Sequence, residues 1–583
     1  MSVKRLSNWW RAASAIGALA VAGYVIFGSF SEKLPVNIGQ AKVTAQPTGS
    51  YLGQSFSLPL GAGGGEAFHA GPVPAPSAAK QAAREAHEEA REQAFRARAA
   101  LLPASDPNVV ARPAPRLSSY TPREALDLRG KTDPGPNADG SIAVYRATEI
   151  DPPAGFASSV AEPAAAQNGK YVFETWNWFA ARSTNGGGAF ALIDPDVYGP
   201  GMPDFCCDQD VIYDKGNDRF HWLRMGIGNV GTAANNQNRI LINVSPDAFA
   251  TNSCFADIRP STFGLSSAFL DYPRMALSNN YLYMSVNVFA FTGGSIGGYI
   301  THIVSRFDLD NLGDCVSLTG NFWNFPAGWN PTLVENAREI MYMGDQIITS
   351  TGLNSTFRVY WMFDDSAVLN FVDQAIAPFQ FTSGASCPVL GGANPCGRAD
   401  HRITGAVLEH NTPTPSNLGA AGDKIDFYWN VEAGNGFPLP YTESAGFFGN
   451  TIQYVQRKLL AYTNATVFYA AVGADDREHV GLTGWFFQPT VNPRMVFGID
   501  DDFNGSPQTT GWELWTLGTL SSDANWTANN SGDYLRVRTH APNGTGWILT
   551  GSNRDLAGAE YRPTYSVWGR GRDLNGFNRF DQQ

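Results

Sequence analysis

From about residue 141 onward, the chain alternates short apolar runs with clusters of Gly, Asn, Asp and Pro. Residues 281–288 and 358–362 are typical of these runs, because β-branched and aromatic side chains dominate them. Helical periodicity almost vanishes in this part of the chain. Short β-rich runs bounded by turn formers are typical of sandwiches, barrels and propellers. The pattern therefore predicts an all-β body.

One element recurs through this body. A polar or charged residue, often beside Pro, opens a short apolar run, and a turn and an aromatic second strand follow. The openings lie at Glu162, Asp208, Asp271, Asn330, Asp400, Glu478 and Asp533. Their spacing is 46 to 78 residues, and a propeller blade needs about 40–50 residues plus loops. We therefore predict a single seven-bladed β-propeller, with six or eight blades as the alternatives and residues 565–569 as a candidate closing strand.

A family resemblance supports this fold. Residues 182–190 read Arg-Ser-Thr-Asn-Gly-Gly-Gly-Ala-Phe. This stretch resembles the Asp-box of sialidase-like propellers, Ser-x-Asp-x-Gly-x-x-aromatic, with Asn185 where the family has Asp. The resemblance implies a propeller over roughly residues 150–575. It also implies that the box is a structural turn between blade strands, so it indicates the fold and not sialidase activity.

An uncharged segment lies near the N-terminus. Lys4, Arg5 and Arg11 precede the run 12–31, which contains no charged residue. At about 1.5 Å per residue, a helix of this length nearly spans a bilayer core. The preceding positive charge predicts a cytoplasmic N-terminus and an exported body. A signal anchor and a cleaved signal peptide both fit, so we expect an extracytoplasmic protein that is membrane-anchored or secreted.

A linker connects this segment to the body. Residues 32–76 are rich in Gly, Pro, Ala and Ser without periodicity, which predicts a flexible spacer. Ser77 can cap an Ala-rich helix that runs to about residue 102, and Pro103 ends it. A Pro-rich stretch then follows. The predicted parts of the chain are a signal segment over 1–31, a linker with its helix over 32–140 and the propeller over 141–583.

Composition and charge narrow the function classes. The chain has 61 Gly and 36 Pro, and only 16% of its residues are charged, which excludes a coiled coil or a helical repeat. The net charge is −12, and residues 1–130 carry 14 basic and 9 acidic groups, so the acidic charge belongs to the body. An acidic body repels phosphate backbones, so no nucleic-acid partner is expected.

Six cysteines are expected to form disulfides in an exported protein. They are Cys206, Cys207, Cys254, Cys315, Cys387 and Cys396. The last two flank a Pro/Gly loop and could staple it, and the middle two could pair across neighbouring blades. The adjacent first two could form a vicinal disulfide, or each could pair elsewhere.

The blade openings also supply the candidate functional residues. The innermost strand of every blade starts at one face of the channel, so residues that open these strands converge on one funnel. The candidate catalytic residues are Asp208, Asp271, Tyr272, His401, Arg402 and His479. The candidate ligand-binding residues are Glu162, Arg274, Asn330, Asp400, Glu478 and Asp533. The alternative role of such residues is to cap blade turns.

Paired carboxylates are the first chemistry that this ring suggests. Asp208 and Asp271 could act as acid and base in glycoside hydrolysis, with their separation deciding the stereochemistry. The acidic ring could also hold Ca²⁺ through oxygen ligands, although no Asp-x-Asp-x-Asp-Gly loop is present. We expect no other cofactor.

Proton abstraction is the second chemistry. His401 with Tyr272 could remove a proton beside a uronate carboxylate that Arg402 or Arg274 neutralises, which would make a polysaccharide lyase.

A non-catalytic propeller that binds a glycan or a surface protein at its funnel is the leading hypothesis, and a carbohydrate-active enzyme is the alternative. The aromatic runs 175–179 and 322–325 could stack on sugars, or they could pack between blades. The expected partners are therefore a polysaccharide or a surface protein, and the membrane through the N-terminal helix.

Overall fold

The computed structural model describes residues 43–63, 110–111, 123–127 and most of 142–571, with single positions between 79 and 93. The gaps within the largest range are 153–161, 228–237, 326–329, 349–352, 381–383, 389–393, 398, 413–421, 435, 501–512, 518–534, 542–543 and 555–560. The predicted signal segment and almost all of the predicted helix over 77–102 lie outside the described residues. No helix among the described residues is long and apolar enough to cross a bilayer.

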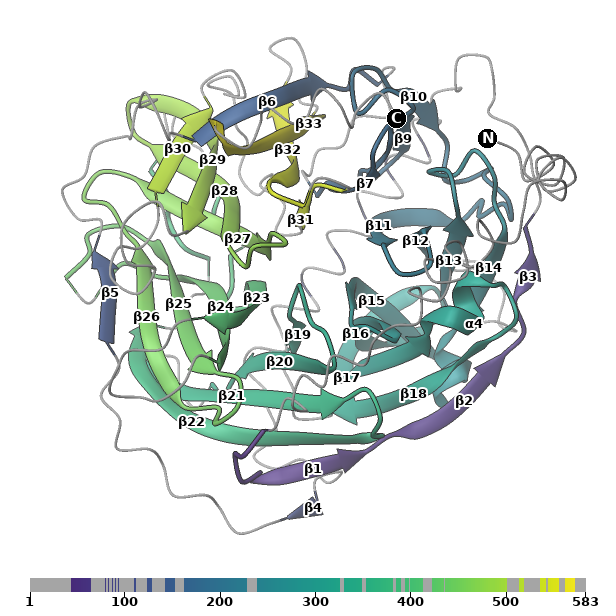
Figure 1. Ribbon diagram of the computed structural model, residues 1–583, viewed down its shortest axis with the longest axis horizontal. Coiled ribbons are helices and arrows are strands. Elements are labelled where there is room, and N and C mark those ends of the chain that lie inside the picture. The colour runs from purple at the N-terminus through teal and green to yellow at the C-terminus, as the bar shows by residue number, and fades with distance from the viewer. Residues whose placement is uncertain are drawn as a thin grey trace, which may run out of the picture. The chain divides into compact units, whose positions relative to one another are not determined.

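Seven sheets, in which almost all strand pairs are antiparallel, surround a central channel, as Figure 1 shows. Each sheet is one blade, and its strands follow one another outward from the channel in chain order. The prediction of a seven-bladed β-propeller is therefore confirmed.

The first three blades use twelve strands in simple up-and-down order. They are β7 (Ala164–Asn168), β8 (Tyr171–Thr175), β9 (Ala180–Ser183) and β10 (Ala191–Ile193); β11 (Phe205–Asp214), β12 (Arg219–Gly226), β13 (Arg239–Ser245) and β14 (Cys254–Ile258); β15 (Ala268–Leu277), β16 (Tyr281–Thr292), β17 (Ser295–Asp308) and β18 (Leu318–Phe325). A 3-10 helix, η3 (Pro260–Phe263), precedes the third blade, and α4 (Leu309–Gly313) lies within it.

The remaining blades repeat this order. They are β19 (Thr332–Leu333), β20 (Ile340–Gln346), β21 (Leu353–Phe363) and β22 (Val368–Gln380); β23 (Ile403–Thr412), β24 (Gly422–Val431), β25 (Tyr441–Phe448) and β26 (Tyr454–Leu460); β27 (Thr466–Ala474), β28 (Val480–Gln488), β29 (Val491–Asp500) and β30 (Glu513–Leu517); β31 (Val537–Thr539), β32 (Trp547–Arg554) and β33 (Tyr561–Arg570).

The ring closes through a strand from the N-terminal side. β6 (Ile142–Glu149) pairs antiparallel with β33 and so supplies the outermost strand of the seventh blade. Residues 565–569, which we predicted to close the ring, lie in β33 and form only part of this closure. Because the first and last segments share one sheet, opening the ring requires breaking these backbone hydrogen bonds.

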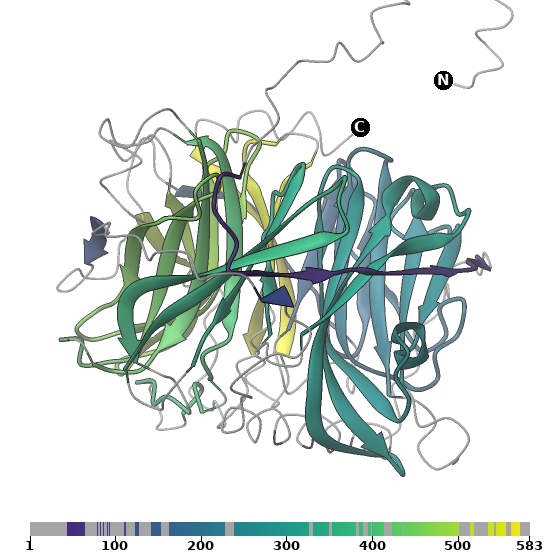
Figure 2. The ribbon, with the colours of Figure 1, turned by 90° about the horizontal axis from the view of Figure 1, so that it is seen from below.

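A belt of three short strands runs along the outer edges of three blades. β1 (Gly49–Leu52) pairs with β22, β2 (Gln54–Leu58) with β18 and β3 (Gly61–Ala62) with β14. Figure 2 shows this belt crossing the blades from the side. Two further strands, β4 (Val110–Ala111) and β5 (Arg123–Asp127), pair with β1 and β26. The prediction of a flexible spacer over 32–76 is thus wrong for residues 49–62.

Aromatic side chains explain why the belt binds there. Tyr51 is buried, and its ring lies 4.7 Å from that of Phe325, centroid to centroid. Phe56 lies 5.7 Å from Phe307 in an edge-on arrangement. The sequence pattern did not predict the belt strands, because isolated aromatic residues in a Gly- and Ser-rich stretch show no periodic repeat.

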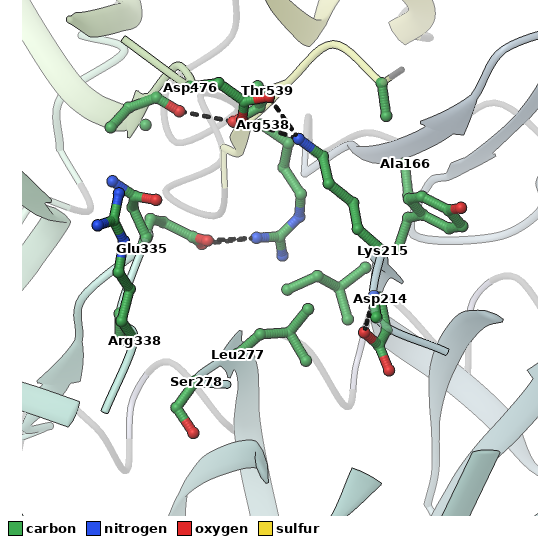
Figure 3. Close-up of a pocket in the computed structure, with 18 of the residues that line it drawn as sticks. Ala166, Asp214, Lys215, Leu277, Ser278, Glu335, Arg338, Asp476, Arg538 and Thr539 are labelled. Atoms are coloured by element: carbon green, nitrogen blue, oxygen red, sulfur yellow. Dashed lines mark hydrogen bonds and ion pairs between the residues drawn. The ribbon is translucent and has the colours of Figure 1, made fainter. Parts of the chain in front are cut away.

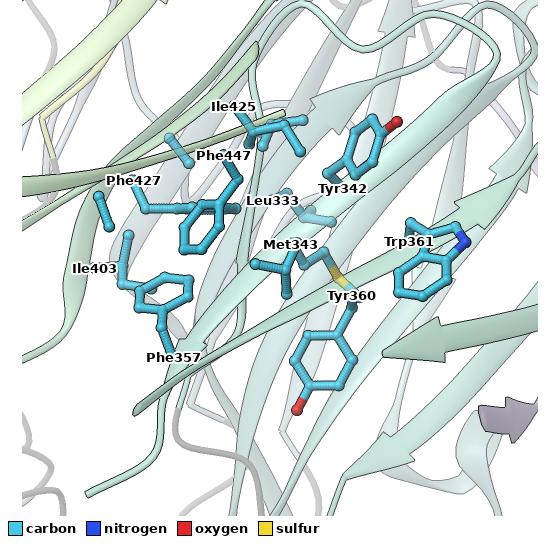
Figure 4. Close-up of a cluster of buried hydrophobic side chains, with 14 of the residues drawn as sticks. Leu333, Tyr342, Met343, Phe357, Tyr360, Trp361, Ile403, Ile425, Phe427 and Phe447 are labelled. Atoms are coloured by element: carbon cyan, nitrogen blue, oxygen red, sulfur yellow. The ribbon is translucent and has the colours of Figure 1, made fainter. Parts of the chain in front are cut away.

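Apolar side chains fill the spaces between blades. Figure 4 shows one such cluster between the fourth and fifth blades. There, the Phe357 ring lies 5.1 Å from that of Phe427 and 5.4 Å from that of Phe447. The aromatic runs follow the same rule, since Trp176, Trp178 and others are buried. Packing between blades, the second of our two interpretations, is what these runs do.

The predicted Asp-box is a turn between β9 and β10. Ser183 Oγ accepts a hydrogen bond from the Gly187 amide at 3.0 Å, and Asn185 Oδ1 accepts one from the Ala189 amide at 2.9 Å. Asn185 thus makes the contact that the family's Asp would make, because an amide oxygen accepts hydrogen bonds as a carboxylate does.

The structure contains a second turn of this kind, which the sequence analysis did not predict. Between β13 and β14, Ser245 Oγ accepts from the Phe249 amide at 2.8 Å, and Asp247 Oδ1 accepts from the Thr251 amide at 2.8 Å. The spacing is identical, but Phe249 replaces the glycine at a left-handed φ of 65°. The motif was missed because that glycine is part of its sequence signature.

Three disulfides are present, so the prediction for all six cysteines is confirmed. Cys254 pairs with Cys315, Cys387 with Cys396, and Cys206 with Cys207. Cys254 lies on β14 and Cys315 follows α4, so that bridge joins the second and third blades.

Candidate functional site

The inner strands give the channel two chemically different ends. We call the end where these strands begin the strand-start mouth, and the end where they finish the strand-end mouth. The funnel predicted from the sequence lies at the strand-start mouth.

Most predicted site residues do lie at the strand-start mouth. Glu162, Asn330, Asp400, His401 and Arg402 immediately precede inner strands, and four others lie within the first residues of β11 and β15. Those four are Asp208, Asp271, Tyr272 and Arg274. These nine residues therefore gather at one end of the channel, where the sequence pattern of strand openings predicted them.

Backbone geometry repeats at this mouth. Cys207, Tyr272, Asn330 and Tyr469 all adopt a left-handed φ, between 51° and 80°, at the same level of four blades. β-Bulges interrupt the pairing beside three of them. Bulges redirect side chains where they interrupt a strand, so these inner strands do not keep a simple in-and-out alternation at this mouth.

Tyr272 brings four of the predicted residues together. Its hydroxyl accepts a hydrogen bond from Arg274 Nη2 at 3.1 Å. The guanidinium carbons of Arg274 and Arg402 lie 5.1 and 4.8 Å from the centre of its ring. Arg402 in turn forms an ion pair with Asp400 at 2.8 Å. We call these four residues the tyrosine cluster.

The tyrosine cluster is buried and tied to the backbone. Arg274 also donates to the carbonyls of Ile403 and Thr404, both at 3.2 Å, which locks the third blade to the fifth. Burial, followed by the charge of Arg402, lowers the pKa of neighbouring His401 to about 3. That imidazole is therefore neutral at physiological pH and a weak base.

The predicted carboxylates of this mouth are buried as well. Glu162 accepts a hydrogen bond from Asn177 Nδ2 at 2.6 Å. Asp208 and Asp271 lie on neighbouring inner strands, and neither lines the cavity described below. Their pairing as acid and base remains a prediction.

Two predicted residues belong to the opposite mouth. Glu478 and His479 lie in the turn between β27 and β28, so the expectation that they open an inner strand is wrong. The Asp475 carboxylate accepts from the His479 amide at 3.0 Å and fixes this turn. The inner strand of that blade begins at Thr466 with no charged residue at its start, so the sequence pattern placed the opening at Glu478 instead. Asp533 lies outside the described residues.

A buried charge network crosses the channel between the two mouths. Asp210 on β11 accepts hydrogen bonds from Arg536 at 3.1 Å and Arg538 at 3.0 Å, and Arg538 pairs with Glu335 at 2.6 Å. Burial alone would raise the pKa of Asp210, but the two arginines outweigh it and lower that pKa. Burial raises the pKa of Glu335, and Arg538 offsets this only in part.

An open cavity of about 460 Å³ occupies the strand-end mouth (Figure 3). Side chains and turns of six blades form it, where the inner strands end. Its charged residues are Asp214, Lys215, Glu335, Arg338, Asp476, Glu478 and Arg538. Ile212, Leu277 and Val537 supply apolar wall between them.

Two ion pairs bridge blades at the rim of this cavity. Lys215 pairs with Asp476 at 2.8 Å, and the two side chains are 47% and 55% exposed. Arg338, also 47% exposed, pairs with Glu478 at 2.5 Å. Figure 3 shows Lys215 reaching across to Asp476 above the pair of Glu335 and Arg538. We call these two exposed ion pairs the rim of the cavity, and the buried network of Asp210, Arg536, Arg538 and Glu335 its floor.

The sequence contained a signal for this mouth that the strand-start rule ignored. Arg536 and Arg538 alternate with apolar residues, so period-two geometry places both on the channel side of one strand. Lys215 and Asp476 lie in charged turns directly after inner strands. Charged residues in the turns that follow inner strands therefore also predict channel-facing sites, as those at the strand starts do.

Among the residues that the structure describes, no three His, Cys, Asp or Glu side chains gather to hold a metal ion. The proposed Ca²⁺ remains a prediction.

Comparisons with known proteins address only the architecture. No protein-family profile matches the chain, and no curated protein matches it. Solved structures with a similar fold include polysaccharide lyase Uly1, at 11% identity and a TM-score of 0.40 over 70% of this chain and 89% of that one. The α-L-arabinofuranosidase Arb93A of Fusarium graminearum has 11% identity and a TM-score of 0.35, over 73% and 97%. The Hadza microbial sialidase Hz136 has 10% identity and a TM-score of 0.32, over 62% and 66%. Likenesses of this size carry no argument about activity or ligand.

Proposed function

We propose that this chain is an exported propeller that binds a short glycan in the cavity at its strand-end mouth. The observation that carries the proposal is the cavity itself, whose volume of about 460 Å³ falls within the range of about 300–1,000 Å³ typical of small-ligand pockets. A propeller channel presents groups from many blades to one ligand, so affinity can come from several weak contacts.

The lining suits a sugar. Apolar wall from Ile212 and Leu277 can cover the C–H faces of a ring. The side-chain oxygens of Asn336 and Thr539 can accept hydrogen bonds from sugar hydroxyls, while their donors are bonded within the protein. Charged side chains at the rim add strong hydrogen-bond partners. A few polar groups set in an apolar surface are the usual arrangement of a specific pocket.

The state of the carboxylates favours binding over hydrolysis at this mouth. Glycoside hydrolysis needs one carboxyl group to donate a proton and another to act as a base or nucleophile. Of the four carboxylates that line the cavity, Glu335, Asp476 and Glu478 each bond to an arginine or lysine, and Asp214 accepts hydrogen bonds from the amides of its own turn. Carboxylates neutralised in this way are poorly placed to serve as an acid–base pair.

A polysaccharide lyase at the strand-start mouth is the second candidate. The tyrosine cluster supports it, because the two guanidiniums beside the Tyr272 ring could hold a uronate carboxylate while Tyr272, as the phenolate, takes the neighbouring proton and becomes a phenol. The low pKa of His401 favours Tyr272 over His401 as the base. Conversion of Tyr272→Phe should then abolish the absorbance of an unsaturated uronate product.

Export is the location that fits this function. Three disulfides in one chain are typical of oxidising compartments. We propose an extracytoplasmic protein, anchored by its N-terminal segment or secreted, whose partner is a polysaccharide or a glycosylated surface protein.

The test is a glycan panel measured by titration calorimetry on the full chain. Binding should fall at least about tenfold in Arg338→Ala, since a rim contact is lost. Arg259→Ala is the matched control, because Arg259 forms a similarly exposed ion pair with Asp257 and does not line the cavity. Equal losses in both variants, or no binding to any glycan, would sink the proposal.

A further inference from the structure

We infer that the ligand of the strand-end cavity carries a carboxylate, and that Arg538 binds this group in place of Glu335. This inference rests on the function proposed above and adds the chemical class of the ligand and the residue that recognises it. In the protein without ligand, Glu335 occupies the position that the ligand's carboxylate takes.

Arg538 is held in place by groups other than Glu335. Its Nε donates to the carbonyl of Val211 at 3.1 Å, and its Nη2 donates to Asp210 Oδ1 at 3.0 Å. Asp210 is itself fully buried and bonded to Arg536. The guanidinium therefore keeps its position and direction when its remaining face changes partner.

Glu335 is the partner on that remaining face. Nη1 of Arg538 donates to both of its carboxylate oxygens, at 2.7 and 2.6 Å. The Glu335 side chain lines the cavity and is 21% exposed, whereas the Asp210 side chain is 0% exposed. Of the two carboxylates on Arg538, only Glu335 can be reached and replaced by a ligand.

Replacement needs only a side-chain movement. The Glu335 amide donates to the Ala406 carbonyl at 2.9 Å, and its carbonyl accepts from the Leu408 amide at 3.0 Å. These bonds fix the backbone of Glu335 against β23. The side chain can rotate away from Arg538 while the blades stay as they are.

A carboxylate is the ligand group that this exchange favours. Nη1 of Arg538 can donate to both oxygens of a carboxylate, as it does to Glu335, whereas a neutral hydroxyl would leave Asp210 as the only negative charge shared by the buried Arg536 and Arg538. Lys215 and Arg338 stand at the rim above the floor. Their exposed ion pairs contribute little to stability, so both cations can turn to an incoming anion at small cost.

The exchange should depend on pH. The charged groups that face Glu335 are Arg538 and Arg536 from the seventh blade and Asp210 from β11. Burial raises the pKa of Glu335 and Asp210 adds to the rise, while the two arginines lower it only in part. A protonated Glu335 competes less well for Arg538, so an ionised ligand should bind more tightly as the pH falls.

The test uses trigalacturonate and its methyl ester, which differ in charge but little in shape. Calorimetry on the full chain should show trigalacturonate binding at least about tenfold more tightly than the ester, and more tightly at about pH 5 than at about pH 7.5. Glu335→Gln should bind trigalacturonate about tenfold more tightly than wild type at about pH 7.5 and lose the pH dependence.

Two further variants separate recognition from folding. Arg538→Gln should lose the preference for the acid over the ester, and Arg259→Gln, outside the cavity, should keep it. Where Arg538→Gln fails to fold, as thermal melting would show, the folded Glu335→Gln protein decides.

The outcomes are distinct from those for the proposed function. Equal affinity for acid and ester, unchanged affinity in Glu335→Gln, or binding of other glycans but of neither probe overturns the carboxylate inference alone. Failure of every glycan, these two included, removes the proposed function itself.

Discussion

The two mouths of the channel hold the same kinds of side chain in different states. At the strand-start mouth, Arg274 and Arg402 are buried against Tyr272. At the strand-end mouth, Lys215 and Arg338 are each 47% exposed and pair with carboxylates of other blades. Residue type is thus a poor guide to environment here, because the same kind of cation is buried at one mouth and exposed at the other.

The comparison predicts a gradient of stability effects along the channel. Removing one partner of a buried ion pair leaves an uncompensated charge in a low-dielectric site, whereas removing an exposed charge returns its partner to water. Substitutions should therefore matter most at the floor, less in the tyrosine cluster and least at the rim.

Arg536→Met should have the largest effect. It removes one of the two cations on fully buried Asp210, so the free energy of unfolding should fall by roughly 3–5 kcal/mol. Chemical denaturation measures this loss. The double variant Arg536→Met with Asp210→Leu should recover part of it, because no unpaired charge is then left. A loss below about 1 kcal/mol in the single variant would mean that the floor is not the fixed region we describe.

Matched Arg→Met substitutions at the two mouths test the comparison directly. Arg274→Met should lower the free energy of unfolding by about 2 kcal/mol, since two backbone carbonyls and the Tyr272 hydroxyl lose their donor. Arg338→Met should cost less than about 1 kcal/mol. The readout is again chemical denaturation of both proteins side by side. Equal effects would show that burial does not separate the mouths.

The sequence predicted the blades better than the site. Turn formers and apolar runs repeat in every blade, so strand count and blade number follow from local pattern. The start of β27 carries no charged residue, however, so the predicted opening fell at Glu478, one strand too late. The belt was missed because its isolated aromatics, such as Tyr51, become meaningful only when distant edges supply partners.

The cavity could not be placed from the sequence for a related reason. Polar residues occur at both ends of the inner strands, and nothing local tells which end is filled. Asp271 and Asp476 are the same residue type, yet one is buried and the other is 55% exposed. That difference depends on the loops and blades that cover each end, which is a property of the whole ring.

A buried acid on the second strand of the first blade tests whether burial alone sets the state of a charge. Glu174 on β8 is buried, and its carboxyl oxygens have no hydrogen-bond partner among the described residues. Burial raises its pKa well above 4.5. The folded protein then holds this proton more tightly than the unfolded chain, so stability is fully present below the ordinary Glu pKa and is lost as the pH rises through the raised one.

Glu174→Gln should remove that loss. Thermal melting of wild type and variant from about pH 4 to about pH 8 should show similar stability in acid and a more stable variant at the alkaline end. Glu149→Gln, on an exposed ion pair with Arg562, is the control and should leave the profile unchanged. Parallel curves for Glu174→Gln and wild type would contradict a buried, protonated carboxyl.

The smallest effect is expected at the rim, where Lys215 and Asp476 form the most exposed cross-channel pair. A double-mutant cycle with Lys215→Met and Asp476→Ala should give a coupling of about 0–1 kcal/mol in the free protein, falling further in high salt because both charges face water. Ligand binding should respond more than stability does, since a cation that is weakly held by its partner is the one free to turn to a ligand. A coupling above about 2 kcal/mol would instead mean that this pair contributes to stability as strongly as the buried pairs do, and the two mouths would then not differ in this respect.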